Sequence, residues 1–246
     1  IGNYTSVRSL MVDESTSRIY AGGSEEFGYY HNDPDRGCFV YKSLMPTLPK
    51  RDRHFTEVWN IHKSGKYIWF QSDFNLLRFD GSKSISIPYK YKITTSALIR
   101  GRLYIASKEG GICQLNGKTF TSVPGGERVK GMRVCALLPY LKGNILIVTE
   151  FNGVFIFDGA TVRPFEMDID PFLKANQVFC AATNERELVF GTVNNGIIIK
   201  DITNGNNTFV NMSTGLQNNT VLSIDFDRMD NIWLGLDNGI DYVLYN

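Results

Sequence analysis

Short runs of alternating apolar and polar residues recur along the whole chain. In the clearest copy, residues 221–227 alternate with period two, 228–231 form a polar turn, and 232–236 are apolar again. The turn Asp237-Asn238-Gly239 then leads into another alternating run over 240–245. Alternation with period two predicts strands, and an Asn-Gly pair favours a tight hairpin turn. This unit is therefore predicted to be a series of antiparallel strands joined by hairpins.

Five earlier units show the same pattern, and each has a short apolar core in its second run. We take one residue of each core as equivalent, which gives spacings of 49, 35, 43, 42 and 44 residues. The equivalent residues are Tyr20, Trp69, Tyr104, Ile147, Val189 and Trp233. No amphipathic helix of ten residues is evident, and the nearest candidate, residues 168–175, contains Pro171.

Six repeats of roughly 40 residues, each with about four short strands, are typical of a β-propeller. A sandwich gives no reason for such a spacing, and β-helix repeats are shorter. We expect an all-β chain of six four-stranded blades that belongs to a seven-bladed ring, with residues 1–246 forming a single domain. In each blade we name the strands a to d in chain order. The second-strand aromatic residues Tyr20, Trp69, Tyr104 and Trp233 are expected to be buried between neighbouring sheets.

Composition narrows the function classes. The 246 residues are 43% hydrophobic and 21% charged, which is ordinary for a globular domain. Lys and Arg number 26 against 25 Asp and Glu, so the chain lacks the basic excess of a phosphate-binding surface and we expect it to bind no nucleic acid. No apolar run approaches the length of a membrane-spanning helix. Because the sequence begins at Ile1, we interpret it as a fragment or a processed product.

Motifs for metal or cofactor chemistry were sought and are not evident. The four cysteines form no C-x-x-C pair, and we expect three of them to be buried in strands rather than in a disulfide framework or a zinc site. The three histidines lack metal-ligand spacing, and neither a nucleophile elbow nor a P-loop occurs. We expect no metal, no cofactor and no catalytic residues.

The repeat itself resembles a known family. Residues 215–223 (GLQNNTVLS) and 231–242 (NIWLGLDNGIDY) look like the two-component-regulator propeller repeat. Residues 18–23 (RIYAGG) and 26–30 (EFGYY) resemble the sensor region of triple-tyrosine-motif transcriptional regulators. The last unit carries the most specific match, whereas the middle units match through their spacing.

This resemblance implies a role in sensing. Regulators of this family carry propellers, usually seven-bladed, outside the cytoplasmic membrane. A tyrosine-rich sandwich domain, a membrane helix and a cytoplasmic output follow, either a helix-turn-helix or a histidine kinase. Many of them sense oligosaccharides in glycan-degrading bacteria. The implied location is periplasmic, and the implied partners are an oligosaccharide, a sister propeller or sandwich domain of the same protein, and a second subunit in a homodimer.

Candidate ligand-binding residues lie in the predicted turns at one edge of the blades. Saccharides are bound by aromatic faces together with amides and carboxylates, so Phe74 and Phe151 beside Asn75 and Asn152 are the sharpest candidates. The b–c turns also supply Glu150, Asn194, Asn195, Asp237 and Asn238, together with Glu25, Glu26, Asp73, Lys108 and Glu109. The d–a turns add Arg53, His54, Lys92, Arg128, Lys130, Asn176, Gln177, Asn218 and Asn219.

Two other functions stay open at this point. The propeller could be a scaffold that packs on another domain or subunit and binds no small ligand. It could also be a secreted lyase or glycosidase, although carboxylates in hairpin turns are more often solvated than catalytic. An arc of six blades would expose the apolar faces of its first and last sheets, so we expect residues outside this sequence, or a partner, to cover them.

Overall fold

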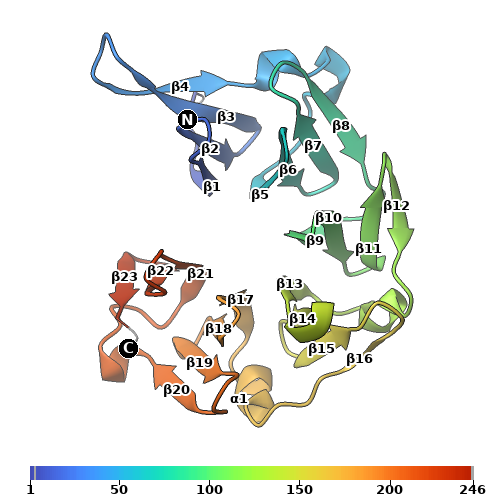
Figure 1. Ribbon diagram of the computed structural model, residues 1–246, viewed down its shortest axis with the longest axis vertical. Helices are drawn as coiled ribbons and strands as arrows, with labels where there is room; N and C mark the ends of the chain where they lie inside the picture. Colours follow the sequence, from blue (N-terminus) through green and yellow to red (C-terminus); the bar gives the residue numbers. More distant parts are fainter. Residues whose placement is uncertain (3, 245–246) are drawn as a thin grey trace. The chain divides into compact units, whose positions relative to one another are not determined.

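The computed structural model describes residues 1–2 and 4–244, which form two compact units, Ile1–Thr121 and a second unit that begins at Ser122. Each unit contains three antiparallel sheets, and within each sheet the strands pair in chain order. Figure 1 shows these six sheets as successive blades. The predicted class is thus confirmed: the chain is all-β and is built from propeller blades.

The first unit contains blades 1 to 3, all four-stranded. Their strands are β1 Val7–Asp13, β2 Arg18–Gly23, β3 Glu26–Asp33 and β4 Cys38–Ser43 in blade 1; β5 Val58–Ser64, β6 Tyr67–Ser72, β7 Asn75–Phe79 and β8 Ser84–Pro88 in blade 2; and β9 Ile93–Ile99, β10 Arg102–Ser107, β11 Gly111–Asn116 and β12 Thr119–Ser122 in blade 3.

The second unit contains blades 4 to 6. Their strands are β13 Val134–Pro139, β14 Ile145–Thr149, β15 Val154–Phe157 and β16 Val162–Pro164 in blade 4; β17 Val178–Thr183, β18 Glu187–Thr192, β19 Ile197–Asp201 and β20 Asn207–Val210 in blade 5; and β21 Val221–Phe226, β22 Ile232–Leu236 and β23 Ile240–Val243 in blade 6. Blade 6 therefore has three strands in the described part of the chain rather than the expected four. Tyr245, at the end of the run predicted as a strand, lies outside the described residues.

Helical structure is confined to short segments. The α-helix α1 spans Asp170–Ala175, close to the segment that the sequence marked as its only helical candidate. Its Pro171 sits in the first turn, where the missing N–H costs no hydrogen bond. The 3₁₀ helices are Met45–Thr47, Lys50–Asp52, Gly126–Val129, Leu141–Gly143 and Met212–Thr214.

A β-bulge recurs near the start of every inner strand. In blade 2, Val58 pairs with Ser72 and Asn60 pairs with Gln71, so Trp59 is the extra residue. A bulge bends its strand and re-aims the side chain of the extra residue. The same register shift makes the extra residues Arg8, Trp59, Thr94, Cys135, Phe179 and Leu222.

The core lies between neighbouring blades, because each sheet has two apolar faces. Tyr20 of blade 1 packs edge-on against Phe70 of blade 2, and Phe27 meets the same ring at 4.8 Å. On its other face, blade 2 directs Trp69 into a cluster with Leu103 of blade 3. In the second unit, equivalent clusters join blade 4 to blade 5 and blade 5 to blade 6.

The register corrects one predicted equivalence. In blade 4, Val148 pairs with Ala136, the residue after the bulge, just as Gly191 pairs with Cys180 in blade 5. The residue equivalent to Val189 is therefore Leu146, and the predicted Ile147 is wrong by one position. A shift of one residue turns a side chain to the other face of the sheet, and four consecutive apolar residues hide the alternation that would have fixed the register.

A second correction concerns Trp233. The predicted burial holds for Tyr20, Trp69 and Tyr104, but the Trp233 side chain is 46% exposed. It occupies the equivalent position on the second strand, since Trp233 pairs with Asp225 as Trp69 pairs with His62. In blades 1, 2 and 5 this position faces the following blade. Within the described residues no sheet of the second unit follows blade 6, and the Trp233 face of this sheet has no partner sheet in that unit.

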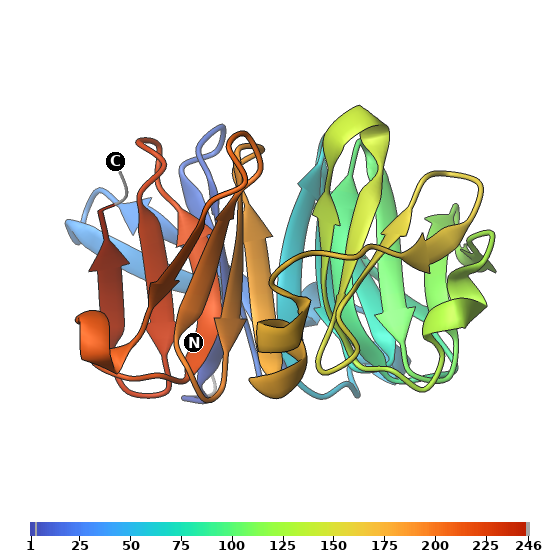
Figure 2. The same ribbon diagram turned by 90° about the horizontal axis from the view of Figure 1, so that it is seen from below.

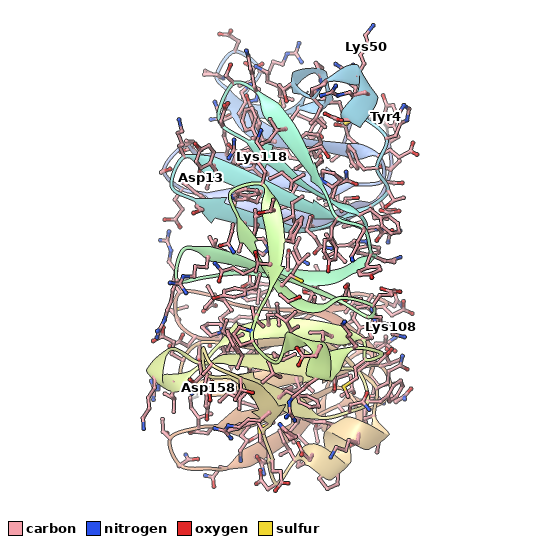
Figure 3. The ribbon with its side chains drawn as sticks, turned by 90° about the vertical axis from the view of Figure 1, so that its right-hand side faces the viewer. Tyr4, Asp13, Lys50, Lys108, Lys118 and Asp158 are labelled. Atoms are coloured by element: carbon pink, nitrogen blue, oxygen red, sulfur yellow. The ribbon has the colours of Figure 1, made fainter. Side chains whose placement is uncertain are left out.

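The turns of each blade lie at its two opposite edges (Figure 2). The b–c and d–a turns share one edge, and the a–b and c–d turns share the other. Figure 3 shows this for the first unit, where Lys108 of a b–c turn and Asp13 at the a–b turn of blade 1 lie on opposite sides of the view. We call the edge with the b–c turns the b–c edge.

Candidate functional site

Backbone hydrogen bonds tie the b–c turns to the d–a turns within each unit. The amide of Ile93, the first residue of β9 in blade 3, donates to the Asp73 carbonyl in the b–c turn of blade 2 at 2.6 Å. In the second unit, the amides of Val178 and Asp237 donate to the carbonyls of Glu150 and Thr220 at 2.9 and 3.0 Å. The b–c turns of blades 2, 4 and 6 are therefore hydrogen-bonded to a d–a turn or to the first residue of an inner strand, at the edge that sequence reasoning assigned to both kinds of turn.

The richest cluster lies at the b–c edge of blade 2. Trp59 is 40% exposed, and its indole Nε1 donates to Asp73 Oδ1 at 2.9 Å. The Lys92 ammonium lies 3.3 Å from the other oxygen of the same carboxylate. Phe74 follows Asp73 and is 46% exposed, while the Asn75 amide nitrogen donates to Ser86 Oγ at 2.8 Å. We call Trp59, Asp73, Phe74, Asn75 and Lys92 the blade 2 edge cluster.

Neighbouring charge holds this tryptophan in place. The guanidinium carbon of Arg8 lies 5.6 Å from the centroid of the Trp59 ring, and its Nε lies 3.0 Å from Glu57 Oε2. Such a cation–π contact orients the ring and adds to the hydrogen bond with Asp73. The result is a largely fixed aromatic surface bordered by ionic groups, which is suited to binding a ligand without a large ordering cost.

A related cluster occurs at the b–c edge of blades 4 and 5. The Arg133 guanidinium lies 5.1 Å from the Phe179 ring and its NH1 is 3.2 Å from Glu150 Oε1. The Gln177 amide donates to the same carboxylate oxygen at 2.9 Å. Phe151, the residue after Glu150, is 49% exposed. We call Arg133, Glu150, Phe151, Gln177 and Phe179 the blade 4 edge cluster.

The other predicted residues are placed at the same kind of edge. Asn152 is exposed beside Phe151, and Asn194 is exposed on blade 5. The Asn195 side-chain oxygen accepts a hydrogen bond from the Asn211 amide at 3.0 Å, so this residue stabilises its turn. Asp237 and Asn238 are exposed in the b–c turn of blade 6. Of the nine predicted residues, Phe74 and Asn75 lie in the first unit and the other seven lie in the second.

Sequence reasoning missed the aromatic residues of the inner strands. Trp59 and Phe179 are extra residues of the recurring bulge, and Arg8 occupies the same position in blade 1. Their signal in the sequence is weak but definable: each follows the valine that begins an inner strand, and the alternation breaks directly after it. A tryptophan or phenylalanine at that position points out of the interblade core.

A largely buried polar network lies behind the blade 2 edge cluster, on strands β5 and β6 of blade 2 and β9 of blade 3. His62 Nε2 is 2.8 Å from Ser96 Oγ, and Gln71 Oε1 accepts from Asn60 at 2.6 Å and from Ser96 at 3.2 Å. Burial lowers the pKa of His62 from 6.5 to about 4, so the imidazole is neutral at pH 7. The network therefore acts as a neutral hydrogen-bonded spacer between the two sheets.

The opposite edge of blades 1 and 2 is locked by an ion pair. The Asp13 carboxylate accepts hydrogen bonds from the Lys63 ammonium and from the hydroxyls of Ser15 and Thr16. Burial alone would raise the pKa of Asp13, but these bonds outweigh it and lower the pKa to about 2. The ion pair of Asp13 and Lys63 thus joins blade 1 to blade 2 at this edge.

Sites of other kinds were sought in the described part of the chain. It contains no group of three or more His, Cys, Asp or Glu side chains that could hold a metal ion. Within the same residues, no helix is long and apolar enough to cross a membrane. Within the described residues the four cysteines form no disulfide; Cys113 is buried, Cys135 and Cys180 are half-buried, and Cys38 is exposed.

Comparison with solved structures identifies other propellers. The extracellular domain of BT4673 from B. thetaiotaomicron matches the whole chain with a TM-score of 0.77 and 20% identity, and the match covers 33% of that domain. BT4673 is named as a one-component system in one of its structures and as a hybrid two-component system in another. Virginiamycin B lyase from Staphylococcus aureus matches 97% of the chain and 84% of its own, with 13% identity and a TM-score of 0.67.

Sequence comparison points in the same direction. Histidine kinase P4 of Formosa agariphila is 26% identical over 201 residues, which are 72% of this chain and 14% of the kinase. No protein-family model matches the chain. The part of the chain that matches Histidine kinase P4 spans about one seventh of the length of that kinase. The chain therefore shares its propeller fold with the extracellular domain of BT4673 and is similar in sequence to part of a histidine kinase, in agreement with the resemblance first seen in the repeat.

Proposed function

We propose that this chain is the ligand-sensing propeller of a membrane-bound regulator and that it works in the periplasm. Support comes from the similarity of the chain to extracellular domains of BT4673 and to a histidine kinase. The ligand class we propose is an oligosaccharide. The propeller binds this ligand, while the other parts of the full-length protein transmit the signal and contact DNA or phosphorylate a partner.

The blade 2 edge cluster is the observation that carries the choice of ligand. It combines two exposed aromatic side chains, Trp59 and Phe74, with a carboxylate that an indole N–H and an ammonium hold in place. Pyranose rings have apolar faces that stack on aromatic side chains and hydroxyl groups that donate to carboxylates. The blade 4 edge cluster repeats this combination with Phe151 and Glu150.

Signalling then follows from differential affinity. A ligand shifts an equilibrium between two arrangements of the regulator only by as much as its binding free energy differs between them. The b–c edge is suited to this task, because its side chains are already ordered by Arg8 and Lys92 and the turns beside them are exposed. A neighbouring domain that contacts the same edge would sense whether the saccharide is present.

Binding, rather than chemistry, is the function that we assign to these carboxylates. Asp73 is engaged by Trp59 and Lys92, and Glu150 by Arg133 and Gln177. A glycosidase instead needs one carboxyl group free to protonate the leaving group. Virginiamycin B lyase shows that an enzyme can use this fold, so turnover must be assayed together with binding.

Calorimetric titration of the purified chain with a panel of neutral and acidic oligosaccharides tests the proposal. We expect one class to bind and Trp59→Ala to weaken its binding by about tenfold, because stacking on an aromatic ring is worth roughly 1–1.5 kcal/mol. Phe209→Ala, at an exposed aromatic residue on outer strand β20, is the matched control and should leave affinity unchanged. A panel without any binder, or equal losses for both variants, would refute the proposal, and release of shortened glycans would favour an enzyme.

A scaffold is the second candidate function, and the two terminal sheet faces favour it. Blade 1 exposes Leu10 and Val12, and blade 6 exposes Trp233 and Ile240. Two large exposed apolar side chains on the same face of a sheet indicate that the face contacts another sheet. A sister propeller, the sandwich domain or a second subunit of a homodimer would supply it.

A further inference from the structure

A cavity separate from both edge clusters lies between blades 4 and 5 of the second unit. Its volume is about 260 Å³, and none of its lining residues belongs to the blade 4 edge cluster. Sites for drug-sized ligands begin at roughly 300 Å³, so this cavity suits a single six-membered ring. Its location is independent of the proposed sensing function, which does not use these residues.

Two aromatic side chains form one wall of the cavity. The Tyr140 and Phe165 rings lie 5.4 Å apart at an interplanar angle of 66°. The apolar floor includes Met167 and the fully buried Leu188, which belong to the core cluster between the two blades. Aromatic faces of this kind favour both the apolar face of a ring and a cation.

The side chains that line the polar side of the cavity have a net negative charge, because its one lysine, Lys200, is paired with Asp168 and two other carboxylates remain. The Lys200 side chain is largely buried. Its ammonium forms an ion pair with Asp168 Oδ1 at 2.8 Å and donates hydrogen bonds to the Gly205 carbonyl and to Asn207 Oδ1, each at 3.2 Å. Asp168 in turn accepts from the Asn207 amide at 2.7 Å. Lysine and aspartate neutralise each other here, so neither selects a charged ligand.

Two further carboxylates, Glu166 and Asp201, line the cavity, and neither forms an ion pair within the described part of the chain. The Glu166 side chain is exposed at the mouth of the cavity, and it forms no hydrogen bond or ion pair with residues 1–2 and 4–244. Asp201 Oδ1 accepts hydrogen bonds from its own turn: from the amide and hydroxyl of Thr203 at 2.7 and 2.6 Å, and from the Asn204 amide at 3.2 Å. These bonds lower the pKa of the Asp201 carboxyl group, and the positive charge of Arg186, which does not line the cavity, lowers it further. Lining groups with a net negative charge raise the local concentration of cations.

We propose that this cavity binds a small organic cation whose body is one six-membered ring, such as a protonated amino sugar. The ring lies against Tyr140 and Phe165, and its ammonium meets the Glu166 and Asp201 carboxylates. Neutral sugars of the same shape gain the stacking but not the charge pairing.

Titrations with glucosamine, glucose and N-acetylglucosamine, followed by amide chemical shifts in NMR, test this proposal. Glucosamine should shift the amides of Met167, Ile202 and Gly205, and the two uncharged sugars should bind about tenfold more weakly, a difference worth about 1.4 kcal/mol. Cyclohexylamine tests whether the sugar hydroxyls contribute to binding. If it binds as tightly as glucosamine, the cavity accepts any amine with a six-membered ring; if it binds more weakly, the cavity also forms hydrogen bonds with the hydroxyl groups.

Substitution of single carboxylates tests whether Glu166 pairs with the ammonium group of glucosamine. Glu166→Gln should weaken glucosamine binding about threefold, which is typical of an exposed ion pair, and added salt should weaken it further. Glu185→Gln, at an exposed carboxylate of the same unit that does not line the cavity, should have no effect. Equal affinity for glucose and glucosamine, shifts confined to other residues, or equal effects of the two variants would overturn the proposal. A failed oligosaccharide titration at the b–c edge would leave it untouched.

Discussion

Trp69 and Trp233 sit at equivalent positions on the second strands of blades 2 and 6, yet their substitution should have very different costs. Trp69 is 8% exposed and packs between two sheets, whereas Trp233 is 46% exposed. Truncating a buried tryptophan to alanine removes the buried area and leaves a cavity, so Trp69→Ala should cost about 3–5 kcal/mol. Trp233→Ala removes roughly half as much buried area and leaves an open surface, so we expect about 1 kcal/mol.

Guanidinium unfolding followed by circular dichroism measures both values. The Tyr242 ring, 4.6 Å from the Trp233 ring, supplies the main contact that Trp233→Ala removes, so Tyr242→Ala should give a similar small loss. Losses that are equal for Trp69→Ala and Trp233→Ala would refute the blade assignment. A longer version of the chain, in which another sheet covers blade 6, should raise the cost of Trp233→Ala toward that of Trp69→Ala and should melt at a higher temperature.

Three further predictions concern pH, packing and thiol reactivity. The pKa of His62 is 6.5 in the unfolded chain and about 4 in the folded chain, so the unfolded chain binds more protons between these pH values. The free energy of unfolding should therefore fall by about 2–3 kcal/mol as the pH is lowered from 6.5 to 4. Urea melts of His62→Gln should lack this pH dependence, and an unchanged dependence would mean that another group causes it. Gly22→Ala places a methyl group in a steric clash with a Val58 methyl carbon and should lower the free energy of unfolding by about 1–3 kcal/mol in thermal melts, and a neutral result would show that blade 2 can move aside. Burial raises the pKa of Cys135 to about 12, so maleimide at pH 7.5 should label exposed Cys38 first, and rapid labelling of Cys135 would contradict its burial.

Period and alternation were sufficient to predict the fold class, because every blade repeats the same order of antiparallel strands and most blades bury the same positions. The exact register was less accessible. In blade 4, the run from Ile145 to Val148 is apolar at every position, so alternation cannot distinguish Leu146 from Ile147. Pairing with the bulged inner strand decides the register, and the bulge appears only once the strands are placed in a sheet.

The exposure of Trp233 and the composition of the edge clusters depend on tertiary context. Sequence equivalence correctly placed Trp233 on a second strand, but burial also requires a neighbouring sheet on that side. Phe74 and Phe151 were predicted at the b–c edge from their place in the turns. Trp59 was missed because its inner-strand bulge, which interrupts the alternation, leaves its ring exposed beside Asp73.

Hydrogen–deuterium exchange with and without a bound oligosaccharide is the most direct test of the central claim, that the chain senses its ligand at the b–c edge. The account predicts slower exchange at residues 56–60 and 72–76, and at 149–153 if the blade 4 edge cluster also binds, while outer strand β20 at Asn207–Val210 stays unchanged. Protection that falls on outer strands and leaves the b–c turns of blades 2 and 4 unaffected would contradict the account.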